Sequence, residues 1–220
     1  LKNTTLKVGS TCIICGTSLR NNLVLEILKK YLKEDFVVYN TASVGSVFQY
    51  LKNKMNPNNF YYSDYCGEMD FGKVIRGVRN ENLEKLTFEN EKFDIVISEE
   101  VFEHIMDYKK AFKEIARVLK SGGVHIFTVP IHENNKTLER IKNGVNLQGV
   151  VYHGDYLRDG IAVYTDFGYD IKDIIKEETG MDTEIITKDN FYKKEQITFI
   201  DNKEYQKYLK YKSEMDKYFC

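Results

Sequence analysis

The 220-residue chain lacks tryptophan and has only two prolines and four cysteines, and its formal net charge is −1. A charge so close to zero provides no broad basic field, which argues against bulk binding of nucleic acid. No apolar run approaches the roughly 18 residues of a membrane-spanning helix, and the N-terminal residues lack the apolar core of a secretory signal. We therefore expect a cytoplasmic protein with no nucleic-acid partner and no membrane span.

Cysteine is too scarce for a disulfide framework: the four are Cys12, Cys15, Cys66 and Cys220. The Cys-Ile-Ile-Cys-Gly segment at 12–16 looks like half of a zinc ribbon, in which two thiolates supply two of four tetrahedral ligands. No second C-x-x-C follows, and the four histidines have no paired spacing. We therefore predict reduced thiols and no metal. The alternative is a zinc site completed by Cys66 or by residues upstream of Leu1.

The remaining composition is that of an ordinary globular protein, with 42% hydrophobic and 30% charged residues. The length suffices for one well-buried α/β domain with extensions, and it is too short for two domains of full size. We predict an N-terminal extension over 1–35, a central domain over 36–200 and a C-terminal helix over 201–220.

The stretch 93–130 organises the predicted domain. Residues 93–98 form a short apolar run typical of a strand buried on both faces. Asp107 is a good N-cap for the following helix, and Gly122 with Gly123 is expected to end that helix through positive φ angles. The apolar residues of the helix fall on one face: Ala111, Phe112, Ile115, Val118 and Leu119. A second strand over 124–129 then completes a right-handed crossover in a parallel sheet.

Five short motifs occur in order along this stretch: Phe93-Asp94, Glu103-His104, Arg117-Val118-Leu119-Lys120, Gly122-Gly123 and Pro130. The string resembles the fourth and fifth strands of the class I S-adenosylmethionine-dependent methyltransferases. The resemblance implies a doubly wound α/β fold with a mostly parallel, seven-stranded, Rossmann-like sheet whose last strand is antiparallel. It also implies S-adenosylmethionine as cofactor and S-adenosylhomocysteine as product.

The loop after the predicted first strand, 36–39, departs from the pattern of that family. Methyltransferases of this class have an acidic residue and a Gly-x-Gly-x-Gly turn here, before a helix that we expect over 46–54. In this chain the cofactor-binding positions that the resemblance implies are Asn40, Thr41, Ala42, Ser43 and Gly45. Ala42 and Ser43 are small enough to keep the backbone accessible. A lost cofactor site, leaving a non-catalytic scaffold, is the alternative.

Two further segments match cofactor-binding positions of the family. A predicted strand over 59–65 ends near Asp64, which the resemblance implies as acceptor for the ribose hydroxyls, the role of the acid in dinucleotide-binding folds. Tyr65 is then expected against the adenosine. Asn82 and Leu83 occupy positions where the family binds adenine, and an Asn oxygen accepts a hydrogen bond from an amino group. The plain alternative for Asp64 is a turn or helix cap.

The loop that follows the strand at 93–98 is expected to face the transferable methyl group, because ligands bind outside the carboxyl ends of parallel strands. We predict that Ser98 and Glu99 contact the cofactor. His104 is a candidate catalytic residue, with a local role in holding the loop as the alternative. Glu103 is expected to be structural.

Residues 131–160 show no sustained period and are expected to form a long loop above the cofactor crevice. The segment 152–156, Tyr-His-Gly-Asp-Tyr, and the later 163–168 resemble a methyltransferase branch often encoded beside sugar-handling genes. His153 with Asp155 is a candidate base, because histidine titrates near neutral pH. The alternative is that both merely fix the loop.

The flanking elements are predicted from apolar spacing. We expect a helix from Asn21 or Asn22 to about Lys33, and the family resemblance implies that it packs near the cofactor. Another spans 170–178 and ends at Gly180. Strands are expected over 184–187 and 196–200, the latter as the antiparallel last strand, and a terminal helix over 201–219.

These observations predict methyl transfer from S-adenosylmethionine to a small-molecule or sugar nucleophile, oxygen rather than nitrogen, with His153 or His104 as base. The sequence does not define the oligomeric state.

Overall fold

The computed structural model describes residues 18–68, 70–131, 136–142, 145–147, 149, 151–153 and 160–186. The chain divides into two compact units, Leu1–Thr183 and Glu184–Cys220, and the elements below belong to the first. The cysteine pair at 12 and 15, the strand expected over 196–200 and the helix expected over 201–219 lie outside the described residues.

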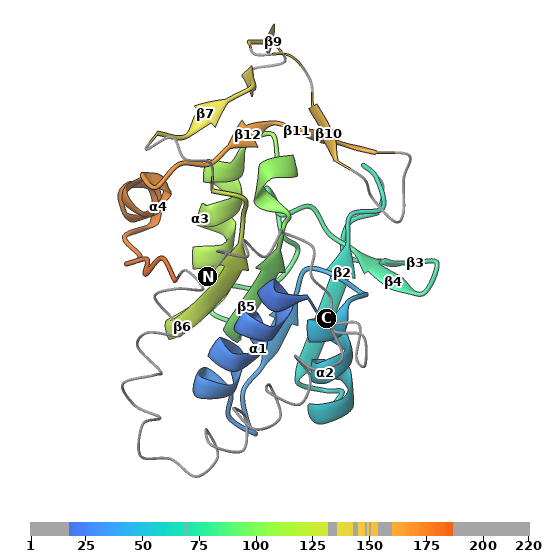
Figure 1. Cartoon of the computed structure of the whole chain (residues 1–220). Coiled ribbons are helices and arrows are strands. Elements are labelled where there is room, and N and C mark those ends of the chain that lie inside the picture. The colour runs from blue at the N-terminus through green and yellow to red at the C-terminus, as the bar shows by residue number, and fades with distance from the viewer. Residues whose placement is uncertain are drawn as a thin grey trace, which may run out of the picture. The chain divides into compact units, whose positions relative to one another are not determined.

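A six-stranded, mostly parallel sheet forms the centre of the first unit (Figure 1). Its strands, in spatial order, are β3 (Val74–Ile75), β4 (Val78–Asn80), β2 (Phe60–Asp64), β1 (Val38–Asn40), β5 (Phe93–Glu99) and β6 (Leu119–Thr128). All neighbours from β4 to β6 are parallel, and β3 pairs antiparallel with β4. This confirms the α/β, mostly parallel, Rossmann-like class, with six strands among the described residues where seven were expected.

Two helices, α1 (Leu19–Tyr31) and α2 (Ser46–Lys54), cover one face of the sheet (Figure 1). Their apolar side chains and the facing strand residues form one core: Val24, Leu28, Val38, Val47, Phe48, Leu51, Phe60, Ile95, Ile97 and Ile126. Burying this apolar surface is the main stabilising contribution to the unit. The start predicted for the first helix was wrong, because Ser18 is its N-cap and its side chain accepts the Asn21 N–H at 3.1 Å.

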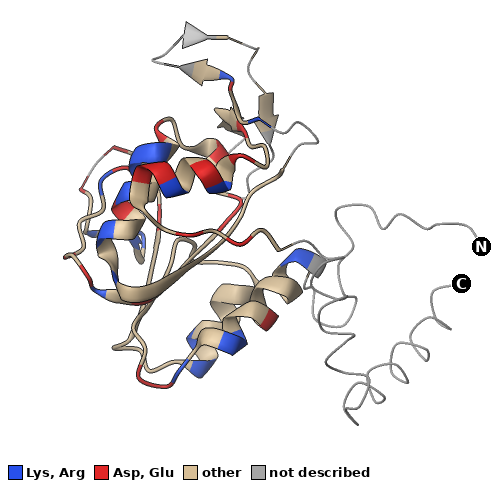
Figure 2. Cartoon of the chain, turned by 90° about the vertical axis from the view of Figure 1, so that its left-hand side faces the viewer, with Lys and Arg blue, Asp and Glu red and all other residues tan. Residues whose placement is uncertain are grey.

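The other face is aromatic and is covered by α3 (Tyr108–Val118). Phe112 of α3 packs against Phe127 of β6 and stacks on Phe102. As predicted, Asp107 caps α3 by accepting the Lys110 N–H. A further helix, α4 (Ile171–Thr179), ends at Gly180 as expected and joins α3 through Glu178, which pairs with two lysines of α3, Lys109 and Lys113. Figure 2 shows acidic and basic residues side by side on these outer helices.

The predicted role of the glycine pair was wrong. Helix α3 ends at Val118 and the chain enters β6 directly, so Gly122, with φ +77°, lies inside a strand. The β5–β6 register shifts between Phe93 and Ile95, which makes the segment an irregularity of the ladder. A Cβ on Gly123 would lie 2.9 Å from the Lys120 carbonyl oxygen, so close backbone approach requires glycine there.

The region after β6, expected to be an irregular loop, contains short antiparallel strands. They are β7 (Leu138–Glu139), β8 (Ile141–Lys142), β9 (Val145–Asn146), β10 (Val151–His153), β11 (Ile161–Val163) and β12 (Thr165–Asp166). β8 pairs with β9, β10 with β11, and β7 with β12. Strands this short show little periodicity, which is why the sequence did not reveal them.

Two smaller expectations have a partial outcome. The first strand lies over Val38–Asn40, two residues later than predicted at its start. Residues 184–186 of the strand expected over 184–187 have no regular structure, and residue 187 is outside the described part. Within the described residues, no helix is long and apolar enough to cross a membrane.

Candidate active site

Loops at the carboxyl ends of β1, β2, β4 and β5 meet at one edge of the sheet, with β1 at the centre (Figure 1). The order of the strands reverses between β1 and β5, because the chain runs from β1 outward to β2 and β4, then returns to β5 and β6. Such a reversal opens a crevice where open parallel sheets bind ligands. The structure brings most of the predicted site residues to this edge.

The loop after β1 is held by its own side chains. Asn40, which replaces the expected acid, is buried and donates from Nδ2 to the Ala42 carbonyl at 2.8 Å. The backbone N–H of Thr41 donates to Ile97 of β5 at 2.9 Å, and the buried Thr41 hydroxyl has no hydrogen-bond partner among the described residues. The loop is thus a defined turn, with one polar group available to a ligand.

Gly45 ends this loop and is the N-cap of α2, with φ +94° and no side-chain cap. Nothing lies within 4 Å of the position that a Cβ would occupy. The positive φ therefore accounts for the glycine, and the space beside it is open. Uncapped N–H groups at a helix start favour a carboxylate or phosphate. Asn21 of α1 donates to the Ser46 hydroxyl at 2.9 Å, which places the start of α1 beside the start of α2.

Asp64 lies at the end of β2 and reaches across to the β1 loop. One carboxylate oxygen accepts the Ser43 N–H at 3.4 Å, and the other accepts a short hydrogen bond from the Ser43 hydroxyl. Asp64, the acid expected to bind ribose, therefore lies at the edge of the crevice. Its carboxylate is hydrogen-bonded to Ser43, and two ribose hydroxyls could donate in place of the Ser43 groups. Tyr65 follows, 40% exposed, with its ring stacked on Phe71.

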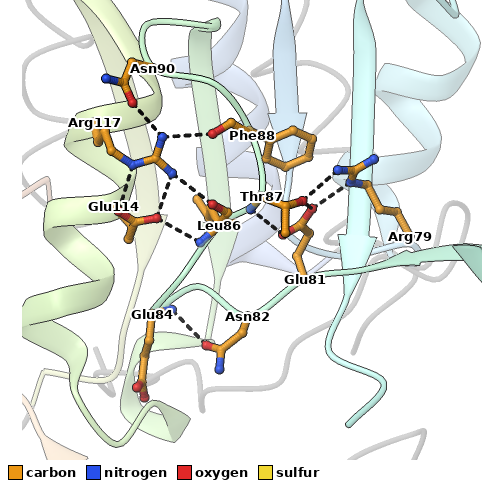
Figure 3. Close-up of polar contacts among 10 residues, drawn as sticks. All are labelled: Arg79, Glu81, Asn82, Glu84, Leu86, Thr87, Phe88, Asn90, Glu114 and Arg117. Atoms are coloured by element: carbon orange, nitrogen blue, oxygen red, sulfur yellow. Dashed lines mark hydrogen bonds and ion pairs between the residues drawn. The ribbon is translucent and has the colours of Figure 1, made fainter. Parts of the chain in front are cut away.

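The loop carrying Asn82 and Leu83 is fixed by buried charges (Figure 3). Glu81 is buried and accepts hydrogen bonds from the Arg79 Nε at 2.7 Å and from the Thr87 N–H at 2.9 Å. The Asn82 side-chain oxygen accepts the Glu84 N–H at 2.8 Å. Asn82 thus forms the turn itself, while Leu83 is buried.

Arg117 of α3 secures the other end of the same loop (Figure 3). Its guanidinium donates to the carbonyl oxygens of Phe88 and Leu86 at 2.8 and 3.0 Å. It also pairs with Glu114, which in turn accepts the Leu86 N–H at 2.8 Å. The Arg-Val-Leu-Lys motif is explained by these contacts, since its arginine ties the helix to the loop expected to bind adenine.

Ser98, which is buried, and His125, which is partly buried, form a pair below the crevice. The Ser98 hydroxyl lies 2.8 Å from His125 Nε2, and burial lowers the pKa of His125 to about 3, so the imidazole is neutral. Since the Ser98 side chain is 1% exposed and already paired, it faces the aromatic core.

Glu99, at the end of β5, is a predicted cofactor contact with an unusual environment. Its Oε1 is buried without a hydrogen-bond partner among the described residues. Burial raises the pKa of Glu99 to about 7, against a lowering by Arg20 of α1. The next residue, Glu100, has φ +53°, a strained backbone for a non-glycine residue, and pairs with Arg20 at 3.2 Å.

Glu103 lies in a 3₁₀ turn, η1 (Phe102–His104), and is 2% exposed. Neither carboxylate oxygen has a hydrogen-bond partner on another described residue. Burial raises the pKa of Glu103 to about 8, against a lowering by its own backbone N–H. Sequence reasoning predicted a structural role for Glu103 and did not predict its unpaired carboxylate, because only the fold buries that side chain.

His104 links η1 to the region after β6. Its Nδ1 lies 2.8 Å from the Ala162 carbonyl of β11, so Nδ1 carries a proton, and Nε2 lies 3.8 Å from Glu103 Oε1. The main-chain carbonyl oxygen of Glu103 accepts the Tyr164 N–H at 2.7 Å. Because β11 pairs with β10, where His153 is opposite Ile161, the two histidine-bearing segments are neighbours. The His153 side chain and Asp155 lie outside the described residues.

Residues 42–127 match the family described as "Methyltransferase domain". That segment includes the β1 loop from Ala42 onward, Asp64, the 81–90 loop and the first four of the five motifs in the strand–helix–strand unit. Over these residues the chain is similar to a methyltransferase domain, which agrees with the resemblance of its motifs to the class I S-adenosylmethionine-dependent methyltransferases. Domains of this class use S-adenosylmethionine as methyl donor. Within the described residues, no group of three or more His, Cys, Asp or Glu side chains could hold a metal ion.

Individual relatives are more distant. A sarcosine/dimethylglycine N-methyltransferase of Aphanothece halophytica is 39% identical over 80 residues, which is 36% of this chain and 27% of that protein. The chain thus matches about a quarter of the length of this curated relative. PH0226 of Pyrococcus horikoshii OT3 is 20% identical with a TM-score of 0.48, covering 76% of this chain and 85% of that one. A putative sarcosine dimethylglycine methyltransferase of Galdieria sulphuraria is also 20% identical, with a TM-score of 0.41 and coverages of 52% and 47%. The narrower resemblance to the sugar-associated branch finds no support in these relatives.

Proposed function

We propose that the protein transfers a methyl group from S-adenosylmethionine to a nucleophile on a small molecule. The observation that supports this most directly is the position of Asp64, at the end of the strand beside β1, with its carboxylate turned to the Ser43 loop. Two ribose hydroxyls would replace the two Ser43 donors. The uncapped start of α2 would receive the carboxylate of the methionine part, and the loop at 81–90 would receive adenine.

The sulfonium group of the donor is already activated, so the protein mainly has to align nucleophile, methyl carbon and sulfur. A hydroxyl acceptor also needs a base. His153 is the better candidate, because His104 is occupied by the Ala162 carbonyl and faces Glu103. Sequence reasoning favours an oxygen nucleophile. The name of the Aphanothece relative raises the alternative of an amine.

A non-catalytic scaffold with the same fold is the second candidate. The observation that favours it is Asn40, which stands in place of the family's acid and is used to hold Ala42. Titration calorimetry with S-adenosylmethionine and S-adenosylhomocysteine separates the two. An enzyme binds both ligands, whereas a scaffold gives neither heat nor a shift in melting temperature.

The base assignment is tested by His153→Ala, assayed with an acceptor found by screening small alcohols and amines. We expect turnover to fall by about 10²-fold, the lower range for loss of a general base, with cofactor affinity unchanged. His153→Asn, which retains a polar side chain without a titrating nitrogen, is the matched control and should lose as much. Equal losses of turnover and cofactor affinity would instead indicate a structural role.

A further inference from the structure

Three glutamates gather at the carboxyl end of β5, and we name Glu99, Glu100 and Glu103 the acidic cluster. Arg20 and Glu100 act electrostatically on both Glu99 and Glu103, the arginine lowering and the glutamate raising their pKa values. The side chains therefore share one neighbourhood. Arg20 is 44% exposed in its side chain and pairs directly with Glu100, so it does not satisfy the other two.

The buried member of the cluster has no structural explanation in the described residues. Glu103 is 98% buried with both oxygens unpartnered, and Oε1 of Glu99 is likewise unpartnered. His104 Nε2 lies 3.8 Å from Glu103 Oε1, which is too far for a hydrogen bond. Burying a carboxylate without partners costs several kcal/mol. A carboxylate in this state calls for an explanation, and a ligand-binding role is one that the physical chemistry of buried polar groups allows.

The chemistry of these groups restricts the ligand to a cation without strict coordination demands. The described residues offer no set of side chains that could hold a metal ion, and an anion would be repelled. An onium ion remains, because its charge is diffuse and is attracted to carboxylates at any approach angle. The cluster also lies at the end of β5, beside the reversal point of the sheet where the cofactor would cross.

We propose that Glu99 and Glu103 form an onium site that receives the sulfonium of S-adenosylmethionine and thereby favours the charged donor over its neutral product. This inference rests on the proposed function and refines it. In the transfer, a lone pair of the acceptor forms a bond to the methyl carbon, and the electron pair of the broken carbon–sulfur bond returns to sulfur. Sulfur loses its charge in that step, so the attraction to the cluster disappears and product release is favoured.

The proposal predicts a dependence on pH. The pKa of Glu99, raised to about 7 by burial, means that the carboxyl is neutral below that pH and attracts the sulfonium only above it. If the ionised form alone binds the donor, affinity for S-adenosylmethionine rises about tenfold between pH 6 and pH 8. S-adenosylhomocysteine carries no sulfonium and should change by less than about twofold. Glu103, with a pKa of about 8, extends the rise to higher pH.

The experiment is titration calorimetry of the full chain with both nucleosides at about pH 6, 7, 8 and 9. Glu99→Gln is the decisive variant, because the ligand's own ionisations are the same for wild type and variant. It should weaken S-adenosylmethionine binding at pH 8 by about tenfold, remove most of its pH dependence and leave S-adenosylhomocysteine unchanged. Glu26→Gln, on the exposed face of α1 where Glu26 pairs with Lys29, is the matched control and should change neither affinity.

A second arm identifies the source of the onium group. Tetramethylammonium chloride is titrated into the S-adenosylhomocysteine complex, against sodium chloride at equal ionic strength. Binding that is lost in Glu103→Gln would assign Glu103 to an ammonium group on the acceptor, and would limit the sulfonium site to Glu99. S-adenosylhomocysteine binding together with equal pH profiles for wild type and Glu99→Gln would overturn the inference and leave the proposed function intact. Absence of heat with both nucleosides would overturn both.

Discussion

The two halves of the crevice differ in how their polar groups are satisfied. On the side of β1, β2 and β4, Asp64, Glu81 and Glu114 all accept hydrogen bonds from neighbouring groups of the protein. At the end of β5, Glu99 and Glu103 have buried oxygens without partners among the described residues. A carboxylate that accepts backbone hydrogen bonds holds that backbone in place. A carboxylate without such donors has acceptor positions left for a ligand. We therefore infer that the first half shapes the site and propose that the second half contacts its ligands.

The strongest way to break the satisfied half is to remove Arg117. Arg117→Leu leaves the Leu86 and Phe88 carbonyls and Glu114 without their donor, so we expect a loss of about 3 kcal/mol in the free energy of unfolding. Urea unfolding measures it. Arg117→Lys, which retains the charge but not the forked geometry, should lose less than half as much. An unchanged midpoint in Arg117→Leu would show that the loop holds itself.

Removing the carboxylate of Glu103, at the end of β5, should increase the free energy of unfolding, whereas removing Arg117 should decrease it. The folded-state pKa of Glu103, about 8, lies above its unfolded value of 4.5. The stability that the protonated side chain allows is complete below pH 4.5 and is lost as pH rises through about 8. Glu103→Gln should therefore raise the free energy of unfolding by about 1–2 kcal/mol at pH 8.

The same variant should be nearly neutral at about pH 5, where the wild-type carboxyl is already protonated in the folded state. Thermal unfolding of wild type and Glu103→Gln across this range, with Glu26→Gln as control, checks both the sign and the pH window. Destabilisation by Glu103→Gln at pH 8 would mean that Glu103 has a partner and belongs to the satisfied half.

The smallest effect on stability is expected at Ser43. Its two groups are hydrogen-bonded to Asp64, and ribose hydroxyls could take their place. Ser43→Ala removes one hydrogen bond to Asp64 and should cost less than about 1 kcal/mol in stability. If ribose hydroxyls replace Ser43, affinity for S-adenosylhomocysteine should stay within about threefold of wild type, or improve. Calorimetry tests this, and Asp64→Asn provides the contrast, since loss of the charged acceptor should weaken binding by at least tenfold (about 1.4 kcal/mol).

Much of the crossover was predictable because its signals are local. The helix at 108–118 follows from apolar spacing and a capping aspartate, and the strand at 93–99 from a short apolar run. The role of Gly122 was not predictable in the same way, since a positive φ serves a helix end and a strand irregularity equally well. The start of α1 was not predictable, because Ser18, Asn21 and Asn22 are all residue types that cap helices well.

Sequence by itself indicated the class of the domain through its five motifs, and three of these motifs make contacts that tie the unit together. Asp94 accepts the Val37 N–H and the Lys120 ammonium, Arg117 holds the 81–90 loop, and Gly123 lies against the Lys120 carbonyl. Tertiary structure alone decided which carboxylates are satisfied. Glu81 and Glu103 are both acidic residues near predicted loops. Glu81 is buried with hydrogen-bond donors, whereas Glu103 is buried without donors from other described residues. Burial and pairing depend on residues far apart along the chain, and no local pattern encodes that distance.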